Sequence, residues 1–99
     1  MKIEEINYLQ LLDTYKGLIT ASRAEIAEMY FGLDLSLTEI AELKGVTRQS
    51  VLDAIKTVKS ELDNFEQKLG LSGLKGAIKQ FALTLEPDQR QKLIDILEK

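Results

Sequence analysis

Apolar side chains recur at steps of three and four residues along nearly the whole chain, and no segment shows the strict alternation of a half-buried strand. Steps of three and four place residues on one face of a helix. The only proline, Pro87, stands near the end of the sequence, where it interrupts little. The pattern therefore predicts an all-helical fold.

Two helices are expected in the first third of the chain. The first covers about residues 3–16 and ends at Gly17. Either Thr20 or Ser22 can cap the second, because a hydroxyl oxygen accepts from the free amides of a helix start. This second helix is expected to extend to Gly32.

The third helix has the clearest start signal. Ser36 followed three residues later by Glu39 matches a capping box, in which each side chain satisfies a backbone amide of the other residue. The helix is predicted over residues 37–44. Gly45 then suits a tight turn, and Thr47 suits a further cap.

A fourth, much longer helix carries apolar periodicity from Val51 to Leu69. Two glycines and a serine are expected to interrupt the helix after this point: Gly70, Ser72 and Gly73. A shorter helix follows over residues 74–85, and a last one begins at Pro87. We expect residues 1–70 to form one domain and residues 71–99 a helical extension, either packed on it or mobile.

Residues 37–51 combine a helix, a glycine turn and a second capped helix. Ala41 is small enough for two helices to cross closely, and Val46 and Val51 are expected to fill the angle between them. The segment therefore predicts a helix-turn-helix. Its second helix would turn its core face inward and present six residues outward: Arg48, Gln49, Leu52, Asp53, Lys56 and Lys59.

This outward face suits nucleic acid. Arg48 can donate two parallel hydrogen bonds to guanine and Gln49 can pair with adenine, while Lys56 and Lys59 suit phosphate oxygens. Asp53 would repel the phosphates unless it accepts from cytosine or pairs with a cation. The candidate interface comprises nine residues: Lys44, Thr47, Arg48, Gln49, Ser50, Leu52, Asp53, Lys56 and Lys59. The alternative is a compact helical scaffold whose charged face contacts solvent or protein.

The long helix also carries a heptad seam, spaced 4, 3, 4, 3 and 4: Val51, Ile55, Val58, Leu62, Phe65 and Leu69. Leu62, Phe65 and Leu69 extend past the helix-turn-helix and need a cover. The first helix or the helix at 74–85 of the same chain can supply it, and so can a second copy. We expect the second copy, because paired recognition helices suit two half-sites.

The composition narrows the chemistry. The chain contains neither cysteine nor histidine. Thiolate ligands, disulfides and imidazole bases are therefore excluded, and we expect no enzyme activity, cofactor or metal. No apolar run approaches the roughly 18 residues of a membrane span, and the first residues lack a signal-peptide core. We expect a cytoplasmic protein that does not enter a membrane.

Charge is distributed unevenly within a formal total of −3. Residues 1–43 hold three basic side chains against eight acidic ones, whereas residues 44–99 hold ten against eight. The positive excess thus begins at Lys44, where the proposed interface begins. The acidic half, or the apolar stripe at residues 93–97, offers the alternative of a protein-docking surface.

The stretch Thr47-Arg48-Gln49-Ser50-Val51 before a long helix, preceded by Glu39-Ile40-Ala41-Glu42, resembles the YlxM family of bacterial proteins. The resemblance covers about residues 5–70, whereas residues 74–99 match no motif. It implies a fold similar to region 4 of sigma factors, DNA binding and a homodimer. It also implies an association with the signal recognition particle genes, so that the RNA or the GTPase of that particle is an alternative partner.

Overall fold

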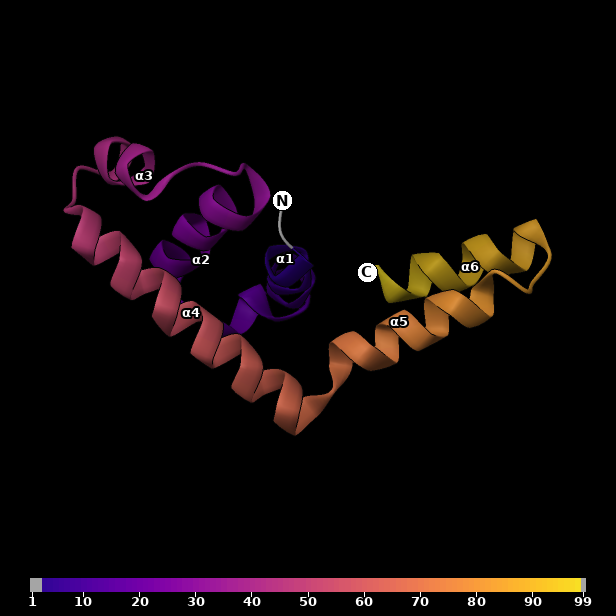
Figure 1. The fold of residues 1–99 in the computed structure, drawn as a ribbon. Helices are drawn as coiled ribbons and strands as arrows, with labels where there is room; N and C mark the ends of the chain where they lie inside the picture. Colours follow the sequence, from indigo (N-terminus) through magenta and orange to yellow (C-terminus); the bar gives the residue numbers. More distant parts are fainter. Residues whose placement is uncertain (1–2, 99) are drawn as a thin grey trace. The chain divides into compact units, whose positions relative to one another are not determined.

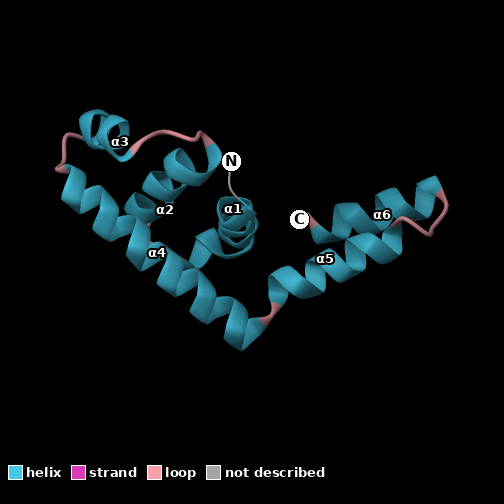
Figure 2. Cartoon of the chain, in the orientation of Figure 1, coloured by secondary structure: helices cyan, strands magenta, loops and turns pink. Residues whose placement is uncertain are grey.

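The computed structural model describes residues 3–98, and the described residues form helices and connecting turns without a β-strand (Figures 1 and 2). Six α-helices follow one another, with two short irregular helical turns between them. The bounds are α1 (Ile3–Tyr15), η1 (Lys16–Leu18), α2 (Ala21–Ala27), η2 (Glu28–Gly32), α3 (Leu37–Lys44), α4 (Arg48–Leu69), α5 (Leu71–Ala82) and α6 (Pro87–Leu97). The all-helical prediction is confirmed. The chain divides into two compact units at the junction between Leu69 and Gly70.

The first two predicted helices are present but end differently from the expectation. α1 gives way at Lys16 to a single 3₁₀ turn, η1. Thr20 occupies the N-cap of α2, yet its side chain accepts no hydrogen bond there. The stretch up to Gly32 is helical, but its last turn, η2, is a π-turn in which Leu33 N–H donates to Glu28 O at 3.1 Å. Periodicity cannot reveal such a change, because it needs only one extra residue in the turn.

α3 and α4 follow the prediction closely. Ser36 and Glu39 form the capping box, with Ser36 Oγ accepting from Glu39 N–H at 3.1 Å and Glu39 Oε1 accepting from Ser36 N–H at 3.1 Å. Gly45 has φ 67°, in the left-handed region that favours glycine. Thr47 Oγ1 accepts from Ser50 N–H at 3.0 Å and so caps α4.

The core of the first unit lies along one stripe of α4. Four of its members come from that helix: Val51, Ile55, Val58 and Leu62. They pack with residues from every other helix of the unit: Leu12, Tyr15, Ile19, Ile26, Ala27, Phe31, Ile40 and Ala41. α4 is therefore the central element of this unit, and α1, α2 and α3 cover its stripe.

Polar contacts fix α1 and α2 on the rim of that stripe. Tyr8 Oη donates to Asp63 Oδ2 at 2.8 Å, and Tyr15 Oη donates to Glu66 Oε1 at 2.6 Å. From α2, Arg23 Nη1 donates to Glu61 Oε1 at 3.1 Å. Each bond joins α4 to a helix that precedes it by more than thirty residues, so together they set the register of the packing.

The predicted dimer seam is wrong for most of its length. Leu62 is fully buried within its own chain, and the Phe65 ring packs against Tyr15 with 5.8 Å between the centroids. Only Leu69 is exposed, at 52%. The first helix supplies the cover, which was the alternative that the spacing left open.

The second unit is a hairpin of α5 and α6. α5 begins at Leu71, immediately after Gly70 at φ 62°, so Ser72 and Gly73 lie inside the helix instead of interrupting it. Both lie in the first turn of the helix, where serine and glycine are less costly than in the helix interior. Pro87 occupies the first turn of α6, as predicted. Arg90 donates from its guanidinium to the carbonyl oxygens of Ala82, Leu83 and Leu85 at 3.2–3.4 Å.

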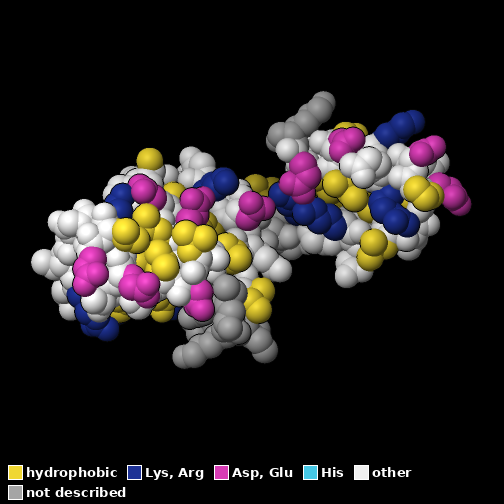
Figure 3. Space-filling view, turned by 90° about the horizontal axis from the view of Figure 1, so that it is seen from above, with side chains coloured by type: hydrophobic (Ala, Val, Ile, Leu, Met, Phe, Trp, Pro, Cys, Tyr) yellow, Lys and Arg dark blue, Asp and Glu magenta, His cyan; other side chains and the backbone are white. Residues whose placement is uncertain are grey.

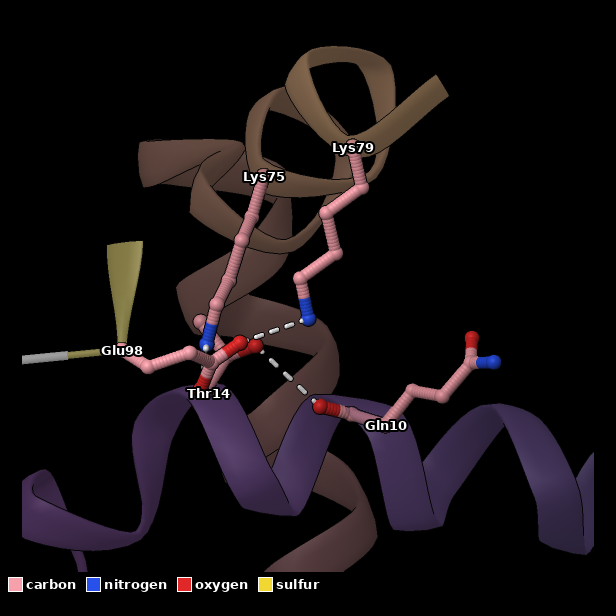
Figure 4. Close-up of polar contacts among 5 residues, drawn as sticks. All are labelled: Gln10, Thr14, Lys75, Lys79 and Glu98. Carbon is pink, nitrogen blue, oxygen red and sulfur yellow. Dashed lines mark hydrogen bonds and ion pairs between the residues drawn. The ribbon is translucent and has the colours of Figure 1, made fainter. Parts of the chain in front are cut away.

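Glu98 ties the end of α6 to α5. Its carboxylate lies 2.8 Å from Lys79 Nζ and 3.8 Å from Lys75 Nζ. Figure 4 shows both lysine side chains extending toward Glu98. The hydrogen bond from Lys79, followed by the positive charges of Lys75 and Lys79, lowers the pKa of Glu98. The ionised form is thus the one that closes the hairpin.

The burial of Leu62 generates a prediction about stability. Leu62→Ala should reduce the free energy of unfolding by about 2–5 kcal/mol, because it leaves a cavity between α4 and α1. Leu62→Glu should unfold the first unit instead of giving a folded monomer. Urea unfolding followed by circular dichroism measures both, with Leu69→Glu as the matched control at an exposed position of the same stripe. A folded Leu62→Glu protein would show that this side chain is not in the core.

The Glu98 contacts predict a titration. Because its folded-state pKa is lowered, pairing with Lys79 supports the hairpin above the ordinary glutamate pKa and is lost as pH falls through the lower folded-state value. Lys79→Met should raise the Glu98 pKa toward its ordinary value, whereas Lys92→Met should leave it unchanged. Carboxyl-carbon NMR of the labelled protein measures both. An unchanged pKa in Lys79→Met would contradict the pairing.

Candidate nucleic-acid interface

The turn between α3 and α4 fixes how α4 begins. Gly45 N–H donates to Glu42 O at 3.4 Å, and Val46 N–H donates to Ala41 O at 3.0 Å, which closes α3. Ala41 and Val51 are buried where the two helices meet, as the helix-turn-helix interpretation requires. Val46 is 45% exposed, so the prediction that it fills the angle between the helices is wrong. The small Ala41 lets the helices approach without it.

The first turn of α4 presents a run of polar side chains to solvent. Thr47, Arg48, Gln49 and Ser50 are all exposed. They stand at the positive end of a 22-residue helix, where backbone amides and the helix dipole favour anions. This is the end of a recognition helix that contacts base edges in helix-turn-helix proteins.

Asp53 has a partner that the sequence did not indicate. Gln49 Nε2 donates to Asp53 Oδ1 at 2.9 Å, one helical turn along α4. Sequence reasoning considered only a cation or a cytosine for this carboxylate. The bond holds the Gln49 amide in place. Its carbonyl oxygen and its second N–H take no part in this bond, and these are the two groups that adenine recognition needs.

The lysines of the predicted interface do not share one surface. Lys56 is exposed on the same side of α4 as Asp53. Lys59 is half-buried, with Nζ 5.4 Å from the centre of the Tyr8 ring and 5.9 Å from that of Phe31. Lys44 Nζ lies 2.7 Å from Glu25 Oε2. The expectation that Lys59 points outward is therefore wrong, because at its position in the helical turn it flanks the core stripe.

Two residues that matter for this surface escaped the sequence analysis. Glu25 holds Lys44 across nineteen residues of sequence, and Tyr8 places its ring under Lys59. Neither pairing has a local spacing signal, since both depend on how α1 and α2 pack on the helix-turn-helix. Leu52, also among the predicted residues, is half-buried beside the exposed turn.

The described part of the chain lacks two further features. Over residues 6–98, whose side chains are described, no three carboxylates gather where a metal ion could be held. Within the same part of the chain, no helix has the length and the apolar character that crossing a bilayer requires.

The capped turn, the buried crossing of α3 and α4 and the exposed first turn of α4 define a helix-turn-helix protein. The chain belongs to the UPF0122 family, described as "Putative helix-turn-helix protein, YlxM / p13 like", whose pattern it matches over residues 3–98. The resemblance drawn from the sequence is thus confirmed.

Relatives carry the same family name. The UPF0122 protein of Desulforamulus reducens is 46% identical over 70 residues, which are 70% of this chain and 60% of that protein. The UPF0122 protein of Thermoanaerobacter sp. is 49% identical over 61 residues, 62% of this chain and 52% of the relative. The chain thus spans little more than half the length of these curated relatives. No solved structure matches it.

Proposed function

We propose that this protein is a DNA-binding regulator that inserts the first turns of α4 into the major groove and catalyses no reaction. The observation that carries the proposal is the exposed run from Thr47 to Ser50 at the start of a capped helix that follows a helix-turn-helix turn. Membership of a helix-turn-helix family supports it. Such a role would keep the protein in the cytoplasm, as the sequence led us to expect.

Each side chain of the exposed turn has a proposed task. Arg48 donates to guanine, and Gln49, held by Asp53, pairs with adenine. Thr47 and Ser50 lie close enough to the helix start to bind phosphate together with the backbone amides. Lys56 contacts a phosphate one or two turns further along. Lys44 and Lys59 add positive charge from the flanks of this surface, and Leu52 adds an apolar contact beside it.

A salt titration tests this function. Binding of the purified protein to pooled duplex DNA, followed by fluorescence anisotropy, should weaken linearly on a logarithmic scale as salt rises, because each neutralised phosphate releases counterions. Absence of binding at low salt would contradict the proposal.

Two variants separate base contacts from phosphate contacts in the same assay. Arg48→Ala should weaken a selected site by about 1–3 kcal/mol and relax its specificity, whereas Lys56→Ala should weaken all duplexes alike and reduce the salt slope by about 1. Arg90→Ala, in the second unit, is not expected to change either property. Equal losses on all sequences for Arg48→Ala would remove its base-reading role.

The alternative ligand of the same turn is the RNA of the signal recognition particle, or a protein of that particle. The small number of exposed cations favours a protein of that particle over a nucleic acid. Of the four basic residues predicted for the interface, Arg48 and Lys56 are exposed, while Lys44 lies against Glu25 and Lys59 against Tyr8. A DNA binder commonly makes six or more phosphate contacts. Tighter binding of that RNA in the salt titration would select this alternative.

For the homodimer that the family resemblance implies, we propose the α5–α6 hairpin as the contact. Among residues 70–98 the side chain of Ala82 alone is counted as buried, while Leu74, Phe81 and Ile96 are 58–63% exposed. The apolar surface of these side chains is therefore available to a second copy of the chain. Its described charges balance, with four basic and four acidic side chains, so a second copy is not repelled.

This contact predicts that Phe81→Glu gives a folded monomer from a dimeric wild-type protein, since the charge would face an apolar partner surface. Sedimentation velocity measures the assembly, and circular dichroism checks that helicity is retained. Leu43→Glu, at a comparably exposed position of the first unit, serves as the control. A monomeric wild-type protein, or a Phe81→Glu protein that remains a dimer, would rule out the hairpin contact.

A further inference from the structure

The chain between Arg23 and Lys44 carries one sign of charge only. Its twenty residues contain five acidic side chains and no lysine or arginine: Glu25, Glu28, Asp34, Glu39 and Glu42. Two of these carboxylates pair with cations from outside the stretch: Glu25 lies 2.7 Å from Lys44 Nζ, and Glu28 lies 4.0 Å from Lys16 Nζ. The other three make no ion pair with a cation among the described side chains, and Arg23 pairs with Glu61 of α4 instead. This stretch therefore presents a negative potential, in contrast to the first turn of α4.

Apolar side chains lie within the same stretch. Leu33 is 69% exposed, the largest exposed fraction among the large apolar residues of the described chain. We define the η2–α3 patch as Leu33 with four half-buried neighbours: Met29, Tyr30, Leu35 and Leu37. The Leu35 N–H donates to Met29 O at 3.1 Å, so the segment after η2 lies against η2. Figure 3 shows apolar side chains gathered over this part of the first unit, with acidic side chains around them.

The backbone explains why Leu33 faces solvent. The π-turn of η2 ends at Gly32, and Asp34 has φ 57°, which turns the chain toward α3. The inward positions of the stretch are already taken, since Phe31 and Ile40 on either side of the turn are fully buried. Leu33 lies between them with no place in the core, so its apolar surface is available to a partner.

We propose that the η2–α3 patch docks a cationic amphipathic helix of another protein. The partner's apolar stripe would pack on Leu33 and the half-buried residues beside it, and its lysines or arginines would face Asp34 and Glu39. The same carboxylates repel phosphate, so neither nucleic acid nor an anionic membrane suits this patch. The protein would then hold a protein partner with α2–α3 and nucleic acid with α4.

The test uses a synthetic 18-residue helical peptide of leucine and lysine, with leucine at steps of three and four, titrated into the ¹⁵N-labelled full-length protein. Amide shift changes should concentrate in residues 28–39 and spare residues 48–56. A peptide with glutamate in place of every lysine should not bind. Equal binding of both peptides, no binding of the lysine peptide, or shifts confined to residues 71–97 would overturn the proposal.

Two variants locate the site without disturbing the core. Leu33→Ser should weaken the lysine peptide at least about five-fold, because it removes the central apolar contact. Asp34→Asn removes one charge while keeping a residue that tolerates the left-handed conformation, and it should also weaken the peptide. Leu83→Ser, at a position 64% exposed in the second unit, is the matched control and should bind normally. If only Leu83→Ser weakens binding of the lysine peptide, the peptide binds the hairpin and not the η2–α3 patch.

The same variants keep this proposal separate from DNA binding. Leu33→Ser should leave the salt titration against duplex DNA unchanged, since Leu33 does not lie on α4. Asp34→Asn should not weaken DNA binding, since the loss of a carboxylate only reduces the repulsion of phosphate. Loss of DNA binding in either variant would show that the patch belongs to the nucleic-acid surface and would overturn a separate protein-docking role. Far-ultraviolet circular dichroism confirms that both variants remain folded.

Discussion

The packing of one stripe of α4 against α1, α2 and α3 determines the rest of the first unit. Val51, Ile55, Val58 and Leu62 are all buried in this stripe. Because a helix has 3.6 residues per turn, a stripe that is buried on one side leaves a fixed set of residues on the other. The burial of these four side chains thus decides which polar residues of α4 reach solvent, and it orients the first turn of the helix away from the core.

That constraint also limits what α4 can do. Leu62 is buried within its own chain and the Phe65 ring packs on Tyr15 of α1, so this seam cannot serve as the contact between two copies. Phosphate contacts are limited for the same reason, since Lys59 stands beside the stripe and packs on Tyr8. The surface left for nucleic acid is short and lies near the helix start. The proposed recognition therefore involves only the first two turns of α4, and the proposed dimer contact lies in a different part of the chain.

The sequence predicts what depends on neighbouring residues and misses what depends on packing. The capping box of Ser36, the left-handed Gly45 and the cap at Thr47 each involve partners within four residues, so their spacing is readable. The packing around Leu62 and the pairing of Lys44 with Glu25 join distant parts of the chain. Periodicity shows that Leu62 lies on an apolar stripe but does not show which helix packs on it. The exposure of Val46 likewise depends on how closely α3 and α4 approach at Ala41.

The acidic α2–α3 stretch and the basic start of α4 together affect how a nucleic acid can approach. A phosphate backbone that approaches Arg48 is repelled by the acidic stretch from Glu25 to Glu42, which restricts the orientations in which a duplex can dock. Specificity depends on such repulsion as well as on attraction. If α4 binds nucleic acid as proposed, the acidic stretch would confine the ligand to the first turns of α4 without contacting it, and would leave Leu33 accessible.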